Sequence, residues 1–391
     1  MNLARLRHQL LDMLAPGGGA IPAGLGATDW QALDAMAAQH RLRPLLHARF
    51  KSIAGVPEDV SQAWRQSHRL AAMEALVADQ DLAETTAILG QLGHQPIALK
   101  GAWLARHVYP EAAQRPMRDL DLLLERDGVI AAYHALKQAG YSDGKAPEMA
   151  LEDVLRLDKH MPPLVAPRGT WIELHHRLWE PDGKLDHATP HGDEAGFRAR
   201  STLGSDGIRY PDPQDMLGHL IVHAVYGHRL NCGPLLLTDL DFLLARHAID
   251  WPRLWQQAQA ERWRDGARLV LDLLMQWHPG APVDFSADQG KPSPAVLLDT
   301  LPDLLLQDLD TRRSAGLIAA ALKGGPARLL RRLRGRQGAN GQGEVQRDVS
   351  REGGKLGWAA SRAWRSLSEL ARADVRRQSR QLAALSKWLD R

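Results

Sequence analysis

Cysteine is almost absent from this sequence, in which Cys232 is the only one among 391 residues. An intrachain disulfide and a zinc site built from cysteine thiolates are therefore excluded, which fits a reducing compartment. Long apolar runs are also missing: residues 235–237 and 304–306 fall far short of the ~20 residues that a membrane-spanning helix needs. Arginines interrupt the apolar residues near the N-terminus, which indicates an amphipathic helix rather than a signal peptide. We therefore expect a cytoplasmic protein without a membrane span.

Charge is unevenly distributed along the chain. The net charge is +3, but residues 323–391 hold 17 Lys and Arg against 6 Asp and Glu, so this tail carries +11 and the rest of the chain −8. The tail could bind nucleic-acid phosphates or an anionic membrane surface. It has few aromatic residues for base stacking and no recognisable nucleic-acid module, so a solvated face or a contact with the acidic body is favoured. Its clustered arginines are Arg328, Arg331, Arg332, Arg334 and Arg336.

The composition is that of a globular protein, with 44% hydrophobic and 24% charged residues, and the length suits two or three structural units. Helical spacing of apolar residues predominates before residue 94 and after residue 211. Between them, strands are predicted at 96–101, 118–125 and 170–179, and helices at 101–110 and 127–141. We predict an α+β fold in which a small mixed sheet lies between helical regions. The predicted units are residues 1–94 (helical), 95–210 (sheet-bearing core), 211–322 (helical) and 323–391 (a basic, partly mobile tail with a terminal helix).

Asp119 and Asp121 are two residues apart in the segment RDLDLLLE, which has strand character. Alternate residues of a strand share a face, so both carboxylates project together while Leu120 and Leu122 turn into the core. Two carboxylates this close repel one another unless a cation lies between them. Asp-x-Asp is a common pattern, and two solvated acids on an edge strand would produce it equally well.

The neighbouring segments favour the metal-binding interpretation. Upstream, a predicted strand runs through Lys100-Gly101 into a helix, which presents backbone N–H groups to an anion. Downstream, Glu173 shares a strand face with Trp171 and His175, and a third carboxylate on a neighbouring strand can join a metal site. Mg²⁺ prefers such oxygen ligands together with substrate phosphates, and Mn²⁺ is the alternative ion.

The order of these motifs resembles an uncharacterised bacterial nucleotidyltransferase family of the polymerase-β-like superfamily. The resemblance rests on Leu-Lys-Gly before a helix, R-x-x-x-D-x-D-L-L from residue 115, a helix ending in Ala-Gly-Tyr, and I-E-L-H-H-R-L-W from residue 172. It covers roughly residues 30–245 and is most specific at 96–180. It implies an α+β nucleotidyltransferase core whose metal-binding and catalytic carboxylates are Asp119, Asp121 and Glu173.

The resemblance also implies which residues contact the nucleotide. Lys100 and Gly101 stand where the wider superfamily has Gly-Ser, so the contact of that serine with the terminal phosphates needs a replacement, for which Lys100 is the candidate. Arg115 matches the family pattern and could clamp triphosphate oxygens, although a structural pairing with an acid is an equal alternative. Arg118 is adjacent to the site, and for it a solvated role is favoured over phosphate contact.

Several histidines could line an acceptor pocket. His175 shares the face of Glu173 and could orient it or contact substrate, or simply be hydrogen-bonded in the wall of the site. His219 and His223 are four residues apart on a predicted helix but lack the intervening glutamate of H-E-x-x-H, so packing between helices is favoured over metal binding. Asp239 and Asp241 form a second Asp-x-Asp, but in a helix they point about 200° apart and make no paired site.

The sequence therefore predicts a nucleotidyltransferase that moves a nucleoside monophosphate from a nucleoside triphosphate such as ATP to a hydroxyl or similar acceptor, releasing pyrophosphate. The alternative is an inactive scaffold that binds a peptide or nucleic acid through its basic tail. The acceptor could be a small molecule or a peptide. Relatives of the family occur near clusters for ribosomally made peptides, so peptide modification is one role that the resemblance suggests.

Overall fold

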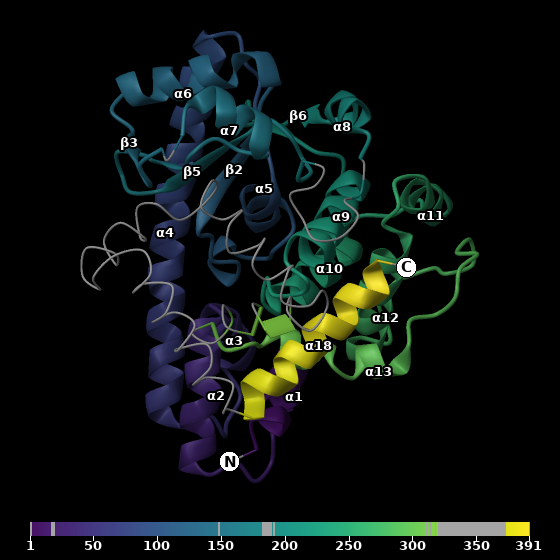
Figure 1. Cartoon of the computed structure of the whole chain (residues 1–391). Coiled ribbons are helices and arrows are strands. Elements are labelled where there is room, and N and C mark those ends of the chain that lie inside the picture. Colours follow the sequence, from purple (N-terminus) through teal and green to yellow (C-terminus); the bar gives the residue numbers. More distant parts are fainter. Residues whose placement is uncertain are drawn as a thin grey trace, which may run out of the picture.

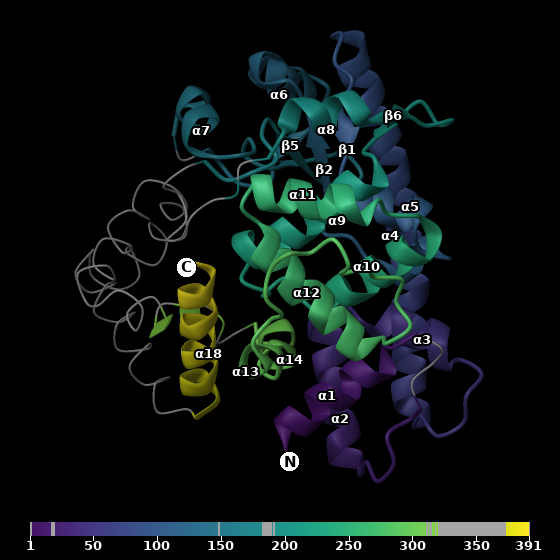
Figure 2. The same cartoon turned by 90° about the vertical axis from the view of Figure 1, so that its right-hand side faces the viewer.

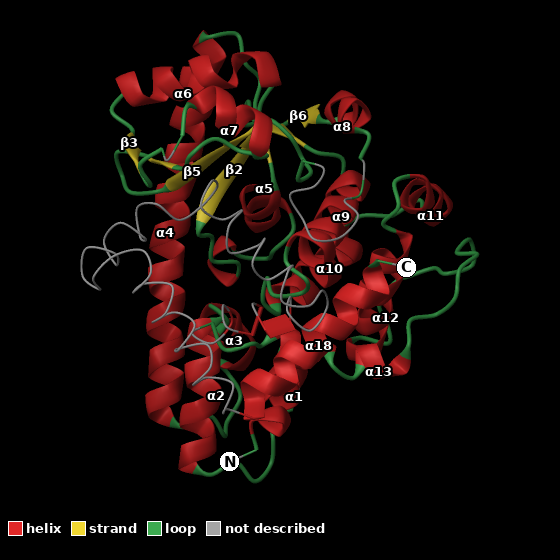
Figure 3. Cartoon of the chain, in the orientation of Figure 1, coloured by secondary structure: helices red, strands yellow, loops and turns green. Residues whose placement is uncertain are grey.

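The computed structural model describes residues 2–16, 20–147, 149–181, 190, 192–309, 312, 315–316, 318–319 and 373–390. Within them, a seven-stranded mixed sheet lies at one end of the molecule and helices make up most of the rest, which confirms the predicted α+β class (Figures 1 and 3). The strands are β1 (Ile97–Ala98), β2 (Asp119–Leu123), β3 (Ser142–Asp143), β4 (Leu164–Val165), β5 (Trp171–His175), β6 (Thr202–Leu203) and β7 (Arg209–Tyr210).

The strand order of the sheet is β3-β4-β5-β2-β1-β7-β6, with β2 at its centre. β2 runs parallel to β5 on one side and antiparallel to β1 on the other. Leu120 and Leu122 of β2 are buried beside Ile172 and Leu174 of β5, so the alternate residues of both strands face away from this core. The strands predicted for these three segments are confirmed, although β1 is only two residues long, as are β3, β4, β6 and β7.

Four N-terminal helices pack together and lead to the sheet. The longest, α4, begins directly after Pro57 and ends two residues before Gly93, whose φ of +83° suits glycine, within the region before residue 94 that was predicted to be helical. α4 runs along one side of the molecule from the N-terminal helices to the sheet (Figure 1). The N-terminal helices are α1 (Leu3–Met13), α2 (Ala27–Gln39), α3 (Arg43–Phe50) and α4 (Glu58–Gln91).

Short helices connect the strands. Helix α5 follows β1 and α6 follows β2, which reproduces the predicted strand–helix–strand–helix order. The helices of this region are α5 (Lys100–His107), α6 (Val129–Gln138), α7 (Leu151–Leu157) and α8 (Glu194–Arg200), with 3-10 turns η1 (Ala112–Gln114) and η2 (Arg126–Gly128).

The C-terminal helices pack below the sheet (Figure 2). α9 starts at Pro213 and gives way at its C-terminal end to η3, a π-helical turn of five residues, where the sequence predicted a continuous helix. Such π turns are rare and often occur at functional sites. The helices are α9 (Pro213–Val222), η3 (His223–Gly227), α10 (Leu235–Arg246), α11 (Trp251–Ala260), α12 (Arg264–Trp277), α13 (Ala295–Leu298) and α14 (Leu301–Leu305).

The last described helix, α18 (Ala373–Leu389), packs against α13 and α14. Asp303 of α14 holds it there, because its carboxylate pairs with Arg377 at 3.2 Å and with Arg7 of α1 at 2.8 Å. The arginine cluster at 328–336 lies outside the described residues, and of the terminal helix predicted for the tail the structure describes residues 373–389. No described helix has both the length and the apolar character that crossing a bilayer requires.

A candidate metal centre on strands β2 and β5

Strand β2 carries Asp119 and Asp121 on the face opposite its buried leucines. The carboxylate of Asp121 is almost fully buried, whereas Asp119, at the start of the strand, is partly exposed. The parallel register with β5 sets Asp121 directly opposite Glu173 and Asp119 opposite Trp171. Because paired residues of neighbouring strands project from the same face, Glu173 lies on the side of the sheet that carries both aspartates.

His175 completes this cluster. It is two residues beyond Glu173 on the same face, and its Nε2 lies 2.8 Å from Asp121 Oδ1 and 3.4 Å from Glu173 Oε2. One ligand atom from each of Asp121, Glu173 and His175 lies within 4.8 Å of the others, and among the described residues this is the only group of three or more such residues that meets this spacing. The sequence predicted Asp119 in the metal-binding set and His175 in the acceptor pocket. In the structure the imidazole of His175 lies in this group, and Asp119 is not part of it.

Lys100 supplies a positive charge to the same carboxylate. It lies at the start of α5 with a φ of +44°, and its Nζ is 2.9 Å from Asp121 Oδ1. The backbone N–H of Leu99 donates to the carbonyl of Asp121 at 2.9 Å, so β1 fixes the start of α5 against β2. Lys100 and His175 therefore donate to one oxygen of Asp121 from different elements.

The pKa values of the carboxylates diverge. Burial raises the pKa of Asp119 to about 6, with further contributions from the negative charges of Asp121 and Glu173. Burial also acts to raise the pKa of Asp121, but Lys100 and His175 outweigh it and hold that pKa well below its usual value. Burial acts to raise the pKa of Glu173, but the hydrogen bond with His175 and the charges of His160 and His175 together outweigh it and lower that pKa. Asp119 is thus the carboxylate whose charge is least compensated, and a bound cation would relieve it.

Gly101 and the arginines next to the site have distinct environments. A Cβ on Gly101 would lie 3.0 Å from Met117 Cγ and 3.4 Å from Arg115 Nη1, so a larger residue would crowd the start of α5. Arg115 bonds both carboxylate oxygens of Asp239 at 2.9 Å, which is the structural pairing that the sequence left open. Arg118 is exposed, as the solvated alternative requires.

The two aspartates of the second Asp-x-Asp have separate partners. Asp239 also accepts a hydrogen bond from Tyr109 at 2.7 Å, whereas Asp241 lies 2.6 Å from Nδ1 of His278. Both lie on α10 and point in different directions, as the helical spacing predicted. The pairing of Asp239 with Arg115 bridges 124 positions, and no local pattern in the sequence indicated it.

The predicted pocket histidines form a row of aromatic rings. His219 of α9 lies 5.5 Å from Trp179 and 6.1 Å from His223, which in turn lies 4.3 Å from His228, measured between ring centroids. His219 is 3% exposed, and neither of its ring nitrogens has a hydrogen-bond partner among the described residues. Burial and, next, the charge of Lys100 hold the pKa of His219 well below its usual value, so the ring is neutral.

His160 was not predicted. Its Nε2 lies 3.9 Å from Glu173 Oε2, and its ring centroid lies 5.2 Å from that of His175. A backbone bridge to His175 places it there, because residue 160 lies beside the end of β5. His160 lies between α7 and β4, in a loop whose next three residues are Met161, Pro162 and Pro163, and nothing in this pattern indicated the pairing.

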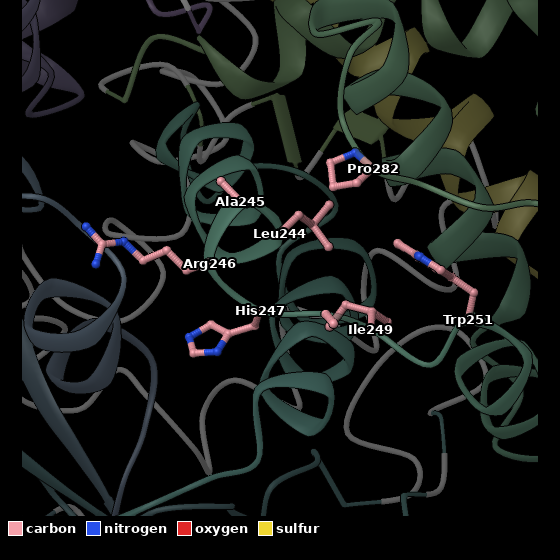
Figure 4. Close-up of a pocket in the computed structure, with 8 residues that line it drawn as sticks. Leu244, Ala245, Arg246, His247, Ile249, Trp251 and Pro282 are labelled. Atoms are coloured by element: carbon pink, nitrogen blue, oxygen red, sulfur yellow. The ribbon is translucent and has the colours of Figure 1, made fainter.

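A separate surface pocket of about 340 Å³ lies at the end of α10 (Figure 4). His247 lines it and stacks on Trp103 of α5 at a centroid distance of 5.5 Å. No carboxylate lines this pocket. Its lining residues are Leu244, Ala245, Arg246, His247, Ala248, Ile249, Trp251 and Pro282.

These features define a class of site: an Asp-x-Asp strand, a third acid on the neighbouring parallel strand, and a lysine at a helix start, together able to hold a divalent metal ion beside an anionic substrate. A family model described as an uncharacterised nucleotidyltransferase matches residues 26–279, from the start of α2 to the end of α12. The match spans more than half of the chain, and the protein belongs to this family, which confirms the resemblance found in the sequence. No curated protein and no solved structure gives a significant match.

Proposed function

We propose that the protein transfers a nucleoside monophosphate from a nucleoside triphosphate to a hydroxyl or similar acceptor and releases pyrophosphate. The observation that carries this proposal is the register of β2 and β5, which sets Glu173 opposite Asp121 on the face that also bears Asp119. Membership of a nucleotidyltransferase family supports the general reaction class.

The residues of the cluster suit a divalent cation. Asp119, Asp121 and Glu173 offer hard oxygen atoms, and their three negative charges exceed the single charge of Lys100. A bound divalent ion would supply positive charge to the triphosphate and to the attacking and leaving oxygens. Mg²⁺ is the ion expected from the sequence, and Mn²⁺ is the alternative.

The start of α5 is the proposed triphosphate site. The Lys100 ammonium lies next to the carboxylates, and the backbone amide of Gly101 lies in the first turn of the helix, where N–H groups lack intrahelical partners. Arg118 is exposed beside the site and free to reach outer phosphate oxygens. Arg115, for which the sequence offered phosphate contact as one alternative, is paired with Asp239. Its side chain packs beside Gly101 and so supports the start of α5.

In the proposed reaction the acceptor oxygen forms a bond to the α-phosphorus while the bond from that phosphorus to the bridging oxygen of pyrophosphate breaks. The proton of the acceptor hydroxyl passes to a carboxylate of the cluster. Asp119, whose pKa is raised to about 6, and Glu173 are the candidate proton acceptors. Stabilisation of the triphosphate charge by Lys100 and the helix start is the main contribution of the chain itself.

The acceptor is proposed to lie against His219 and His223, beside the carboxylate cluster that includes His175. The unbonded ring nitrogens of His219 can each form a hydrogen bond with a polar acceptor molecule, a small molecule or a peptide. The nearby rings of Trp179 and His223 provide flat surfaces for packing.

The proposal is tested by measuring pyrophosphate release and calorimetric binding with each of the four nucleoside triphosphates, with and without Mg²⁺. We expect Asp119→Asn and Asp121→Asn to abolish release while Glu125→Gln, which removes an exposed charge just beyond β2, leaves it unchanged. Equal turnover in the two aspartate variants and the parent chain would remove the proposal. Nucleotide binding without any turnover would instead favour the inactive binding protein.

A further inference from the structure

We propose that His175 is a nitrogen ligand of the divalent cation in this site, so that the site prefers a first-row transition-metal ion to Mg²⁺. This inference rests on the proposed function, because it concerns the same metal centre. It differs from the all-carboxylate site that the sequence predicted, in which Asp119, Asp121 and Glu173 hold Mg²⁺.

The positions of the donor atoms carry the inference. His175 Nε2 lies 2.8 Å from Asp121 Oδ1 and 3.4 Å from Glu173 Oε2. Ligand atoms that share one ion at bond lengths near 2.1 Å, roughly at right angles, are about 3 Å apart. The imidazole nitrogen therefore already stands at the spacing of a ligand set with these two carboxylates. Asp119 is not part of the group whose ligand atoms all lie within 4.8 Å of one another.

The imidazole is also held in place. His175 is 1% exposed, it lies in β5, and the ring of His160 packs 5.2 Å away. Without a metal ion, Nε2 donates its hydrogen to Asp121 Oδ1. Nδ1 has no hydrogen-bond partner among the described residues, so the ring can carry its proton there when an ion takes the Nε2 lone pair. A ligand fixed in this way need not be reorganised when the ion binds.

Ligand chemistry then decides which ion is preferred. Mg²⁺ takes oxygen ligands almost exclusively, whereas first-row transition ions accept imidazole nitrogen as well as carboxylate oxygen. Mn²⁺ has the lowest affinity of these transition ions for a given site, so a preference for Mn²⁺ over Mg²⁺ implies the same for the others. A mixed set of one nitrogen and two carboxylates therefore selects against Mg²⁺.

The test uses the full chain with Mn²⁺ alone, in the absence of nucleotide. We expect pulsed electron paramagnetic resonance to detect ¹⁴N coupling to bound Mn²⁺, and calorimetry to show that Mn²⁺ binds at least about tenfold more tightly than Mg²⁺. In His175→Gln the coupling should vanish and the preference should fall about tenfold or more. In His160→Gln, which removes the neighbouring ring, both should persist. His175→Asp should restore tight binding with the preference shifted towards Mg²⁺.

A parent protein that binds Mn²⁺ without nitrogen coupling would overturn the inference, as would unchanged coupling in His175→Gln. If His175→Gln does not fold, labelling the parent protein with ¹⁵N-histidine decides the matter, because a histidine ligand must change the modulation pattern. Pyrophosphate release is measured separately. Release with Mg²⁺ but no nitrogen coupling would refute this inference alone, whereas coupling without release would refute only the proposed reaction.

Discussion

Asp121 and Glu173 lie directly opposite one another on the parallel strands β2 and β5, and the imidazole of His175 lies within hydrogen-bond distance of both carboxylates. The two acids are separated by about 50 positions in the sequence and are brought together by a single strand pairing. Lys100 reaches the same oxygen of Asp121 from the start of α5, so three elements of the core meet at one atom. The chemistry proposed for the protein depends on this convergence.

Asp119→Asn should make the protein more stable at neutral pH in the presence of a chelator. Its folded-state pKa is about 6 against a usual value near 3.8, so the folded chain binds the proton more tightly than the unfolded chain does. Asp119 therefore does not lower the free energy of unfolding below pH 4. Its destabilising effect grows as the pH rises to about 6 and is constant above that. At pH 7.5 the free energy of unfolding of Asp119→Asn should exceed that of the parent protein by roughly 1–3 kcal/mol.

Denaturant unfolding of both proteins from pH 4 to 8 checks this prediction. The difference in free energy of unfolding should be near zero at the acid end and reach a plateau above pH 6. Glu125→Gln, which removes an exposed carboxyl close by in the chain, should show no such profile. A variant that is less stable than the parent at pH 7.5 would mean that Asp119 is well compensated in the native state.

Arg115→Met should destabilise the fold rather than weaken nucleotide binding. The substitution leaves the Asp239 carboxylate buried without its bidentate partner, and breaking such a pair costs about 3–5 kcal/mol. The exposed Arg118 offers a control, because Arg118→Met should change stability by no more than about 0.5 kcal/mol. Thermal unfolding measures both.

The double variant Arg115→Met with Asp239→Leu should recover part of the lost stability, because it removes both members of the pair. If Arg115→Met instead unfolds at the temperature of the parent protein but no longer binds nucleoside triphosphate, the guanidinium is a phosphate clamp. That result would favour phosphate contact, the other alternative that the sequence left open for Arg115.

Lys100→Met should change metal and nucleotide binding in opposite directions. Removing the ammonium from Asp121 lets a divalent ion bind without competition, so Mn²⁺ affinity should rise in the absence of nucleotide. Triphosphate affinity should fall about ten- to hundredfold, the loss expected for hydrogen bonds to a charged group. Calorimetry with each ligand checks both changes.

Lys137→Met is the matched control, since it breaks a lysine–aspartate pair, with Asp143, that lies away from the site. It should leave both affinities unaltered. A Lys100 variant in which the two affinities fall together would show that the lysine acts by holding the carboxylates in place and not by competing with the ion.

His219→Phe should stabilise the protein. Phenylalanine keeps the ring packed against Trp179, and it removes two buried nitrogens that lack partners, each of which costs about 1–3 kcal/mol when unsatisfied. His176→Phe provides the contrast, because Nε2 of His176 bonds the carbonyl of Leu155 at 3.0 Å and its loss should not be stabilising. Chemical denaturation of the parent protein, His219→Phe and His176→Phe checks this prediction. If His219→Phe is less stable than the parent protein, the imidazole contributes to the stability of the fold, and the interpretation that it is kept at a cost in stability in order to bind a ligand is wrong.

The local sequence determined which side chains can share a face. The alternation of apolar and charged residues in Asp119–Leu123 and Trp171–His175 has a period of two, and this period already places Asp119 with Asp121 and Glu173 with His175. Proline and glycine likewise set the ends of α4, since both act on the backbone of their own neighbourhood. The other strands, β1, β3, β4, β6 and β7, are only two residues long, too short for any period to be read.

The tertiary structure alone decided which faces meet. A period says nothing about which strand lies next to which, so only the sheet order could bring His175 to Asp121, or His160 to Glu173. The same holds for Arg115, whose partner Asp239 belongs to a helix far along the chain. Pairings of this kind depend on how distant elements pack around a common core, and that information is spread over the whole sequence and not contained in any one segment.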